Sequence, residues 1–254
     1  MIASLLLDLS LAAAVVGAVC LIRPLAFLGV RSRRAAALPL AVGLLFAIAV
    51  ALWPPPVRRS AGRAAIDRFL PEYTFAEFHE TRVHAAPEAV YRATLDVTPD
   101  EIRYLKPLMA IRSFPASLLG RRSLSPKTAL PILELATRST FFYLAQEPPR
   151  ELVVGTVGQF WKLDGGRLPG TRSAEEFLAF EDPGFARAVV NFAVEDAGGG
   201  WSRLTTETRI FAPKGQARRR LGAYWRLIYP GSSLIRIGWL EGIRRRAEAP
   251  SRTP

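Results

Sequence analysis

The chain begins with two long apolar stretches, and regions of mixed pattern follow them. Residues 35–53 (AAALPLAVGLLFAIAVALW) form a run of 19 residues without a charge, and a helix needs about 20 to cross about 30 Å of hydrocarbon. Residues 2–22 are equally apolar apart from Asp8, which lies near the helix end, where burying a carboxylate has a modest cost. A secretory signal is the rival interpretation, but no basic residue precedes Arg23. The pattern therefore predicts a two-helix transmembrane hairpin over residues 1–56.

A short basic stretch follows the hairpin. Residues 57–70 (VRRSAGRAAIDRFL) carry four arginines, and their apolar residues recur at intervals of four. Two interpretations stay open for this juxtamembrane linker: an amphipathic helix whose arginines meet lipid phosphates, or a solvated connection. Arginines lie on both sides of residues 35–53, so the positive-inside bias leaves the orientation nearly undetermined. The folded domain is expected at 71–254.

Strand-like and helix-like segments alternate in the domain. Residues 75–85 alternate as a strand does. One helix is predicted from Pro87, and a second follows a Thr98–Glu101 capping box. Residues 115–131 lack a clear period and predict a surface loop. Five strand-like runs follow, with Pro- or Gly-containing turns between them: 139–146, 150–163, 173–181, 186–196 and 201–212. Such an order predicts an antiparallel meander.

The last long segment has the pattern of a helix. Apolar residues in 216–248 recur at spacings of three, four and seven, which defines one continuous face. About 30 residues at 1.5 Å each give a helix of about 45 Å, enough to cover one face of a curved sheet, and its arginines mostly lie away from that face. The pattern as a whole predicts an α+β fold, in which an antiparallel sheet wraps on a long C-terminal helix.

This order of elements resembles the START-like, or SRPBCC, superfamily with its helix-grip fold. The resemblance extends over about residues 71–248, and the segments that carry it are HETRVHAAPEAVYRA, RELVVGTVGQFW, EDPGFARAVVNF, TTETRIFA and YWRLIYPGSSLIR. They are similar to a bacterial branch in which the membrane hairpin is an addition. The resemblance implies a deep cavity between the sheet and the C-terminal helix that binds a lipid, sterol, polyketide or other apolar molecule. It supplies no catalytic residues.

The charge of the chain points to an anionic partner. The formal net charge is +12, from 34 basic and 22 acidic residues. No nucleic-acid-binding motif appears, and the predicted hairpin makes the bilayer the nearest source of anionic phosphate. We therefore expect membrane lipid and no nucleic acid as a partner, with the oligomeric state left open. We place the protein in the cell membrane as a multi-pass protein. Its domain is expected on the cytoplasmic side, where most members of the superfamily work.

Few residues offer acid–base or metal chemistry. The two histidines, His79 and His84, are five residues apart in a predicted strand and therefore point to opposite faces. Cys20 is the single cysteine, so a cysteine-based zinc site is excluded. We expect no metal and no cofactor. His79 shares a strand face with Glu77, which could orient it, and it is the candidate catalytic residue if the protein is an enzyme.

Other polar and aromatic residues are candidates for ligand binding. Glu207 and Arg209 share one strand face and could fix a polar ligand head if that face lines the cavity. Their neighbours Leu204 and Ile210 look like the more apolar face, which favours an ordinary surface pair. Large aromatic residues either pack in the core or line the cavity: Trp161, Tyr224, Trp225 and Tyr229.

Three functional hypotheses follow. The leading one is membrane-tethered binding of an apolar or amphipathic, lipid-like small molecule in the cavity between the sheet and the C-terminal helix. The alternative is an enzyme of the cyclase or dehydratase kind that uses the same cavity. A third is a membrane-anchored interaction module with a filled core. The glycine-rich turns lack P-loop spacing and no G-x-S-x-G elbow is present, so the sequence favours neither a nucleotide-binding protein nor a serine hydrolase.

Overall fold

The computed structural model divides the chain into two compact units. It describes residues 2–23, 32–53, 55–60, 62, 64–118, 130–162 and 169–249. The hairpin unit comprises Met1–Pro55 with Arg218–Pro230, and the sheet unit comprises Pro56–Ala217 with Gly231–Pro254. The predicted linker at 57–70 therefore groups with the sheet unit.

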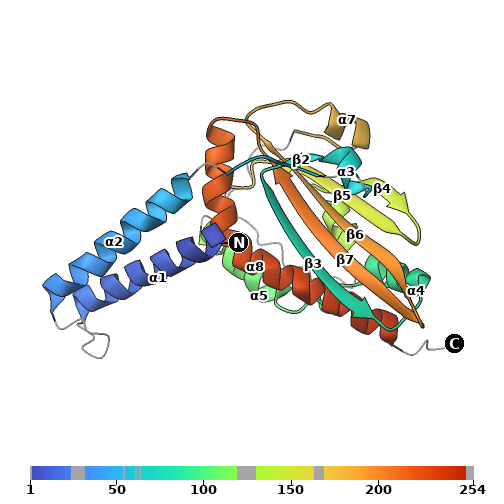
Figure 1. Ribbon diagram of the computed structural model, residues 1–254, viewed down its shortest axis with the longest axis horizontal. Helices are drawn as coiled ribbons and strands as arrows, with labels where there is room; N and C mark the ends of the chain where they lie inside the picture. Colours follow the sequence, from blue (N-terminus) through green and yellow to red (C-terminus); the bar gives the residue numbers. More distant parts are fainter. Residues whose placement is uncertain are drawn as a thin grey trace. The chain divides into compact units, whose positions relative to one another are not determined.

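Two apolar helices, α1 (Ile2–Ile22) and α2 (Arg33–Leu52), form the hairpin unit together with the first part of α8 (Figure 1). The backbones of α1 and α2 come close together, since a Cβ built on Gly17 would lie 2.6 Å from the amide nitrogen of Leu40. Glycine allows this approach, as it does in membrane helix pairs. The segment Leu5–Ile22 is long and apolar enough to cross a membrane by length and composition, and α2 holds the shorter apolar stretch Arg34–Val50.

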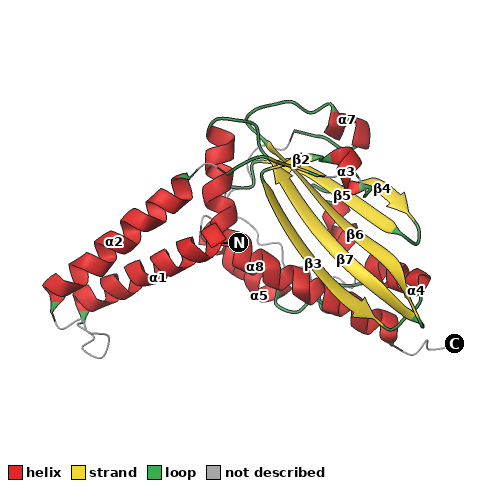
Figure 2. Ribbon diagram, in the orientation of Figure 1, coloured by secondary structure: helices red, strands yellow, loops and turns green. Residues whose placement is uncertain are grey.

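The sheet unit is built on a five-stranded antiparallel sheet, confirming an α+β fold with a long C-terminal helix (Figure 2). Its strand order is β3-β7-β6-β5-β4, in which four consecutive strands form the predicted meander. The strands are β3 (Phe75–Val83), β4 (Phe142–Glu147), β5 (Glu151–Gly158), β6 (Ala186–Gly198) and β7 (Trp201–Phe211), and β1 (Arg58–Arg59) pairs with β2 (Glu72–Tyr73) outside this sheet. The helices are α3 (Ile66–Phe69), α4 (Pro87–Asp96), α5 (Leu105–Leu118), α6 (Ile132–Thr137), α7 (Ala174–Leu178) and α8 (Gln216–Glu248).

Apolar side chains cover both faces of the sheet. On what we call the inner face, Leu152, Phe192 and Leu204 pack with residues of α4 and α6 and with Trp239 and Ile243 of α8. On the outer face, residues of β4, β5 and β6 pack with α3 and α7. All residues of β5 are consequently buried, because successive side chains of a strand point to opposite faces.

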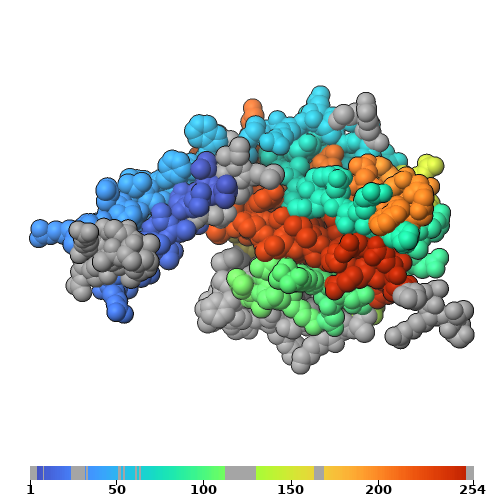
Figure 3. Space-filling view, turned by 60° about the horizontal axis from the view of Figure 1, so that its bottom comes forward, coloured from blue at the N-terminus to red at the C-terminus, as the bar shows by residue number. Residues whose placement is uncertain are grey.

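The segment before α5 packs closely against α8. A Cβ on Gly238 would lie 2.4 Å from the carbonyl oxygen of Arg103, and one on Gly242 would lie 2.9 Å from that of Glu101. Figure 3 shows α5 and the C-terminal half of α8 side by side on one surface. Close packing against this backbone therefore explains why two of the four glycines of α8 lack a side chain.

Several sequence predictions need correction. The strand expected at 173–181 is the helix α7, because Ser173 and Glu176 form a capping box at its start. Thr98 and Glu101 do make capping hydrogen bonds, but the helix begins only at Leu105, after Tyr104 with φ of 66°. The loop expected at 115–131 contains the end of α5, and residues 119–129 lie outside the described residues.

Candidate functional site

A cluster of polar side chains lies on the inner face of the sheet, beneath α8. We call it the inner polar cluster: Glu77 and His79 of β3, and Ser232 and Ser233 of α8. Ser232 Oγ donates to Glu77 Oε2 at 2.7 Å, and Glu77 Oε1 lies 2.9 Å from His79 Nε2. Ser233 Oγ lies 3.3 Å from the same nitrogen. Two elements more than 150 residues apart in the chain thus meet through these four side chains.

The side chain of Glu77 is fully buried, with 0% exposure, and the side chain of His79 is 17% exposed. A buried carboxylate needs positive charge and hydrogen bonds to offset its lost hydration. Arg236, one turn after Ser232 on α8, contributes that charge, and its guanidinium also lies 5.2 Å from the ring centroid of Trp239. Burial lowers the pKa of Arg236, and the charge of Glu77 counteracts this shift.

One hydroxyl next to the cluster lacks a partner. Thr208 of β7 is the register partner of Glu77, and its Oγ1 is buried without a hydrogen bond from any described residue. An unpaired buried polar atom is costly and calls for an explanation, such as a ligand or water. The inner polar cluster therefore has hydrogen-bonding capacity that the protein's own described side chains do not use.

The cluster does not have the geometry of a serine nucleophile. In a Ser–His–acid relay, one histidine nitrogen faces the hydroxyl and the other faces the carboxylate. Here Glu77 and Ser233 both face Nε2 of His79. If Glu77 is ionised it can only accept, so Nε2 must donate to it and cannot take a proton from Ser233. The arrangement can hold a polar group or exchange a proton at His79, and it does not activate Ser233.

Sequence reasoning found part of this site. Strand alternation placed Glu77 and His79 on one face, as the structure has them. It considered Ser232 only as a serine nucleophile and did not place it beside Glu77. It placed Arg236 among the arginines mostly turned away from the apolar face of the C-terminal helix. Ser232, Arg236, Trp239 and Ile243 follow one another at spacings of four, three and four, so helical periodicity could have placed Arg236 on the sheet-facing stripe.

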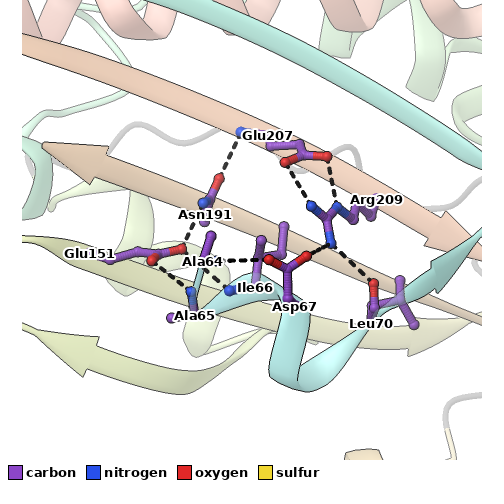
Figure 4. A network of polar contacts seen from close by, with 9 residues as sticks. All are labelled: Ala64, Ala65, Ile66, Asp67, Leu70, Glu151, Asn191, Glu207 and Arg209. Atoms are coloured by element: carbon purple, nitrogen blue, oxygen red, sulfur yellow. Dashed lines mark hydrogen bonds and ion pairs between the residues drawn. The ribbon is translucent and has the colours of Figure 1, made fainter. Parts of the chain in front are cut away.

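Glu207 and Arg209 lie on the outer face, away from the inner polar cluster (Figure 4). Both oxygens of Glu207 accept from the guanidinium of Arg209, at 2.7 and 3.0 Å. Nη1 of Arg209 also donates to Asp67 at 2.6 Å and to the carbonyl of Leu70 at 3.3 Å. The sequence left two positions open for this pair: the lining of the cavity, or the exposed surface. The structure shows neither, because the pair faces α3 rather than α8 or open solvent.

The network continues across the sheet toward α3 (Figure 4). The Asn191 side chain accepts from the Glu207 amide and donates to Glu151 at 2.7 Å each. Glu151 in turn accepts from the amides of Ala65 and Ile66 at the start of α3, where a negative charge is favourable. Because these contacts satisfy the described groups among themselves, the network serves to fasten α3 to the sheet.

The predicted aromatic residues belong to two different units. Tyr224, Trp225 and Tyr229 belong to the part of α8 that groups with the hairpin unit, where the rings of Trp225 and Tyr229 meet at 6.2 Å. Trp161 belongs to the sheet unit and follows β5. Its indole Nε1 is buried without a hydrogen-bond partner in the described chain.

Comparisons with known proteins leave the family of the chain undetermined. No protein-family model and no curated protein matches it. Among solved structures, the crystal structure of TTHA0849 from Thermus thermophilus covers 70% of this chain and 99% of its own, at 12% identity and a TM-score of 0.27. A score this low carries no argument about fold or function.

Within the described residues, no group of three or more His, Cys, Asp or Glu side chains could hold a metal ion.

Proposed function

We propose that the protein is a membrane-anchored module that binds an apolar or amphipathic, lipid-like small molecule between the inner face of its sheet and α8. The observation that carries the proposal is the inner polar cluster, in which charged and hydroxyl side chains converge within an otherwise apolar interface. Small-molecule sites are typically apolar with a few placed polar groups. The helix-grip fold that the sequence resembles also has its ligand between sheet and helix, which supports the same location.

The chemistry of the cluster favours a ligand head that donates hydrogen bonds. Glu77 offers carboxylate oxygens, and the unpaired hydroxyl of Thr208 can both donate and accept. A hydroxyl-bearing head placed there would satisfy Thr208, while the apolar body would rest on neighbouring aliphatic and aromatic side chains.

We further propose that α1 and α2 both span the membrane and that the sheet unit lies on the cytoplasmic side. The support is the apolar surface of the hairpin unit, where large side chains such as Leu9, Leu45 and Ile48 are exposed. Helices that are apolar on all sides are typical of membrane spans. We expect the full chain to stay in the membrane pellet after an alkaline carbonate wash, and release into the supernatant would overturn the anchor.

The proposed side of the membrane can be tested with a single new cysteine. Cys20 is the only natural one and is fully buried, so it gives a low background. Ala197→Cys adds an exposed thiol at the end of β6. A membrane-impermeant maleimide should label it in inside-out vesicles and not in intact cells, and the reverse pattern would contradict the cytoplasmic placement.

The ligand can be tested with the full chain in a mild detergent. Compounds bound to the purified protein are extracted and identified by mass spectrometry. We expect a stoichiometric amphiphile that is strongly reduced in Glu77→Gln, because this substitution removes the buried charge at the cluster. Glu80→Gln is the matched control, since it removes the same charge from an exposed position of the same strand. No bound compound in any preparation would favour the interaction module with a filled core.

His79 favours an enzyme as a second candidate function. It lies on the inner face and contacts a buried carboxylate, as a proton-transfer residue of a cyclase or dehydratase would. Once a ligand is identified, the wild-type chain should convert it, whereas His79→Gln should still bind it without converting it. Equal conversion by both proteins would eliminate His79 as the catalytic residue.

A further inference from the structure

An arginine on the outer face of the sheet has no ion-pair partner among the described residues. Arg187 lies at the start of β6, and its guanidinium is 5.7 Å from the ring centroids of both Phe177 and Phe211. Its one hydrogen bond with a described residue is a long contact of 3.4 Å to the carbonyl of Phe177. No carboxylate of the described residues lies within ion-pair distance. Burial lowers the pKa of Arg187, and Glu181 only partly opposes this shift.

Arg209 has the carboxylate partners that Arg187 lacks among the described residues. Arg209 lies on the same face, two residues before Phe211 on the neighbouring strand, and it is held by two carboxylates and one carbonyl. Its donors are therefore used within the fold. The guanidinium of Arg187 keeps most of its five N–H donors available in surroundings that are largely aromatic. A partly buried cation of this kind is stabilised when an anion binds to it.

Two hollows of the sheet unit meet at Arg187. The larger has a volume of about 440 Å³, and its lining residues include Arg59, Ser60, Leu70 and Phe211. The smaller, of about 200 Å³, is lined by Phe180, Phe185, Glu181 and Asp182 among others. Arg187 and Phe211 line both. The smaller hollow is lined by two acids and one arginine, a balance that disfavours an anion. The larger hollow is lined by two arginines, Arg59 and Arg187, and by one acid, Glu72, which pairs with Arg59.

We propose that the larger hollow binds the phosphate of an amphiphile, held by Arg187, with its apolar part against Phe211 and Leu70. The planar guanidinium suits a phosphate because it can donate two parallel hydrogen bonds. Trp53 and Arg59 are six positions apart in the sequence, so the covalent chain between them spans at most about 20 Å. This site is separate from the inner polar cluster and stands independently of the proposed function.

The test uses the full chain in phosphatidylcholine nanodiscs, titrated by calorimetry with short-chain phosphatidic acid, short-chain phosphatidylcholine and inorganic phosphate. We expect phosphatidic acid to bind more tightly than the other two. Arg187→Gln should weaken this binding more than about 10-fold, because it removes the charge that faces the phosphate. Arg203→Gln is the matched control. It removes the same charge from an exposed residue paired with Glu195, and it should change the affinity less than about twofold.

Stability measurements separate binding from folding. Since Arg187 has no ion pair to lose, Arg187→Gln without ligand should melt within about 2 °C of wild type. If that variant fails to fold, Arg187→Lys keeps the charge but loses the planar fork, and its affinity should still fall at least about threefold. Unchanged affinity in a folded Arg187 variant would overturn the site. Equal binding of inorganic phosphate and phosphatidic acid would overturn the amphiphile as its ligand.

Discussion

Asp67 and Arg209 are 142 residues apart in the chain, yet their side chains form a 2.6 Å ion pair at 8% and 6% exposure. The pair joins α3 to β7 on the outer face of the sheet. Burial of Ile66 and Leu70 beside it completes the attachment. The segment that follows the hairpin in the sequence is therefore part of the folded sheet unit, although its composition resembles a basic linker.

Replacing Arg209 should strongly destabilise the sheet unit. Arg209→Gln would leave the buried Asp67 and the partly buried Glu207 without this counter-ion, and we expect a loss of about 3–5 kcal/mol in the free energy of unfolding. Asp67→Asn should cost less, about 1–2 kcal/mol, because Arg209 keeps its contacts with Glu207. Chemical denaturation of the full chain in nanodiscs, followed by tryptophan fluorescence, measures both. If the two variants were equally stable, the assigned roles would be wrong.

Acid should weaken the same attachment. Burial raises the pKa of Asp67, but hydrogen bonds, including those from the Ala64 amide and Arg209, outweigh it and lower this pKa from 3.8 to about 2. A carboxyl whose pKa is lower in the folded state than in the unfolded state stabilises the fold at pH values above its unfolded-state pKa. This contribution disappears as the pH falls toward 2. The loss should amount to about 2 kcal/mol between pH 5 and pH 2.

The control for the acid effect is Asp67→Asn. It has no carboxyl group at this position to titrate, so the stability difference from wild type should shrink as the pH falls through this window. Hydrogen bonds from Thr98 and Arg246 to Glu101 outweigh its burial and lower its pKa as well, which adds an acid-dependent loss common to both proteins. A difference that is constant from pH 6 to pH 2.5 would contradict the role of Asp67.

Two glycines of α8 should respond oppositely to alanine. In Gly238→Ala the new Cβ would lie 2.4 Å from the carbonyl oxygen of Arg103. The backbone of Arg103 cannot move away without disturbing its surroundings, so we expect destabilisation of about 1–3 kcal/mol. In Gly231→Ala the nearest atom is Cδ2 of Leu108 at 3.7 Å, an ordinary contact. The higher helix propensity of alanine should then stabilise the protein by up to about 1 kcal/mol. Thermal unfolding of the two variants provides a direct comparison.

Loss of the Glu151 carboxylate should release α3 locally. Glu151→Gln weakens the charged contact with the amides of Ala65 and Ile66, for which we expect a cost of about 1–2 kcal/mol. A short helix opens locally more often than the whole protein unfolds, and each opening exposes the nearby backbone to a protease. Trypsin should therefore cleave after Arg59 or Arg68 several times faster in the variant. Glu147→Gln, which breaks only an exposed contact with Arg68, should leave α3 and the rate after Arg59 nearly unchanged.

Local patterns in the sequence were enough for the main elements. The long apolar stretches predicted two apolar helices, the alternating runs predicted most strands of the meander, and the spacing of apolar residues predicted α8 from Gln216 to Glu248. Alternation also put Glu77 and His79 on one face. These features depend on neighbours within one turn or one strand, so they are encoded locally.

Tertiary structure decided what the polar residues do. Strand alternation puts Glu207 and Arg209 on one face, but only the packing of α3 shows that this face is covered and that Asp67 completes the pair. In the same way, Ser232 and Arg236 became neighbours of Glu77 because α8 packs on β3 and its partners. Whether a charged side chain is exposed, paired or part of a site depends on contacts between residues far apart in the chain. Periodicity along one segment carries no information about such contacts.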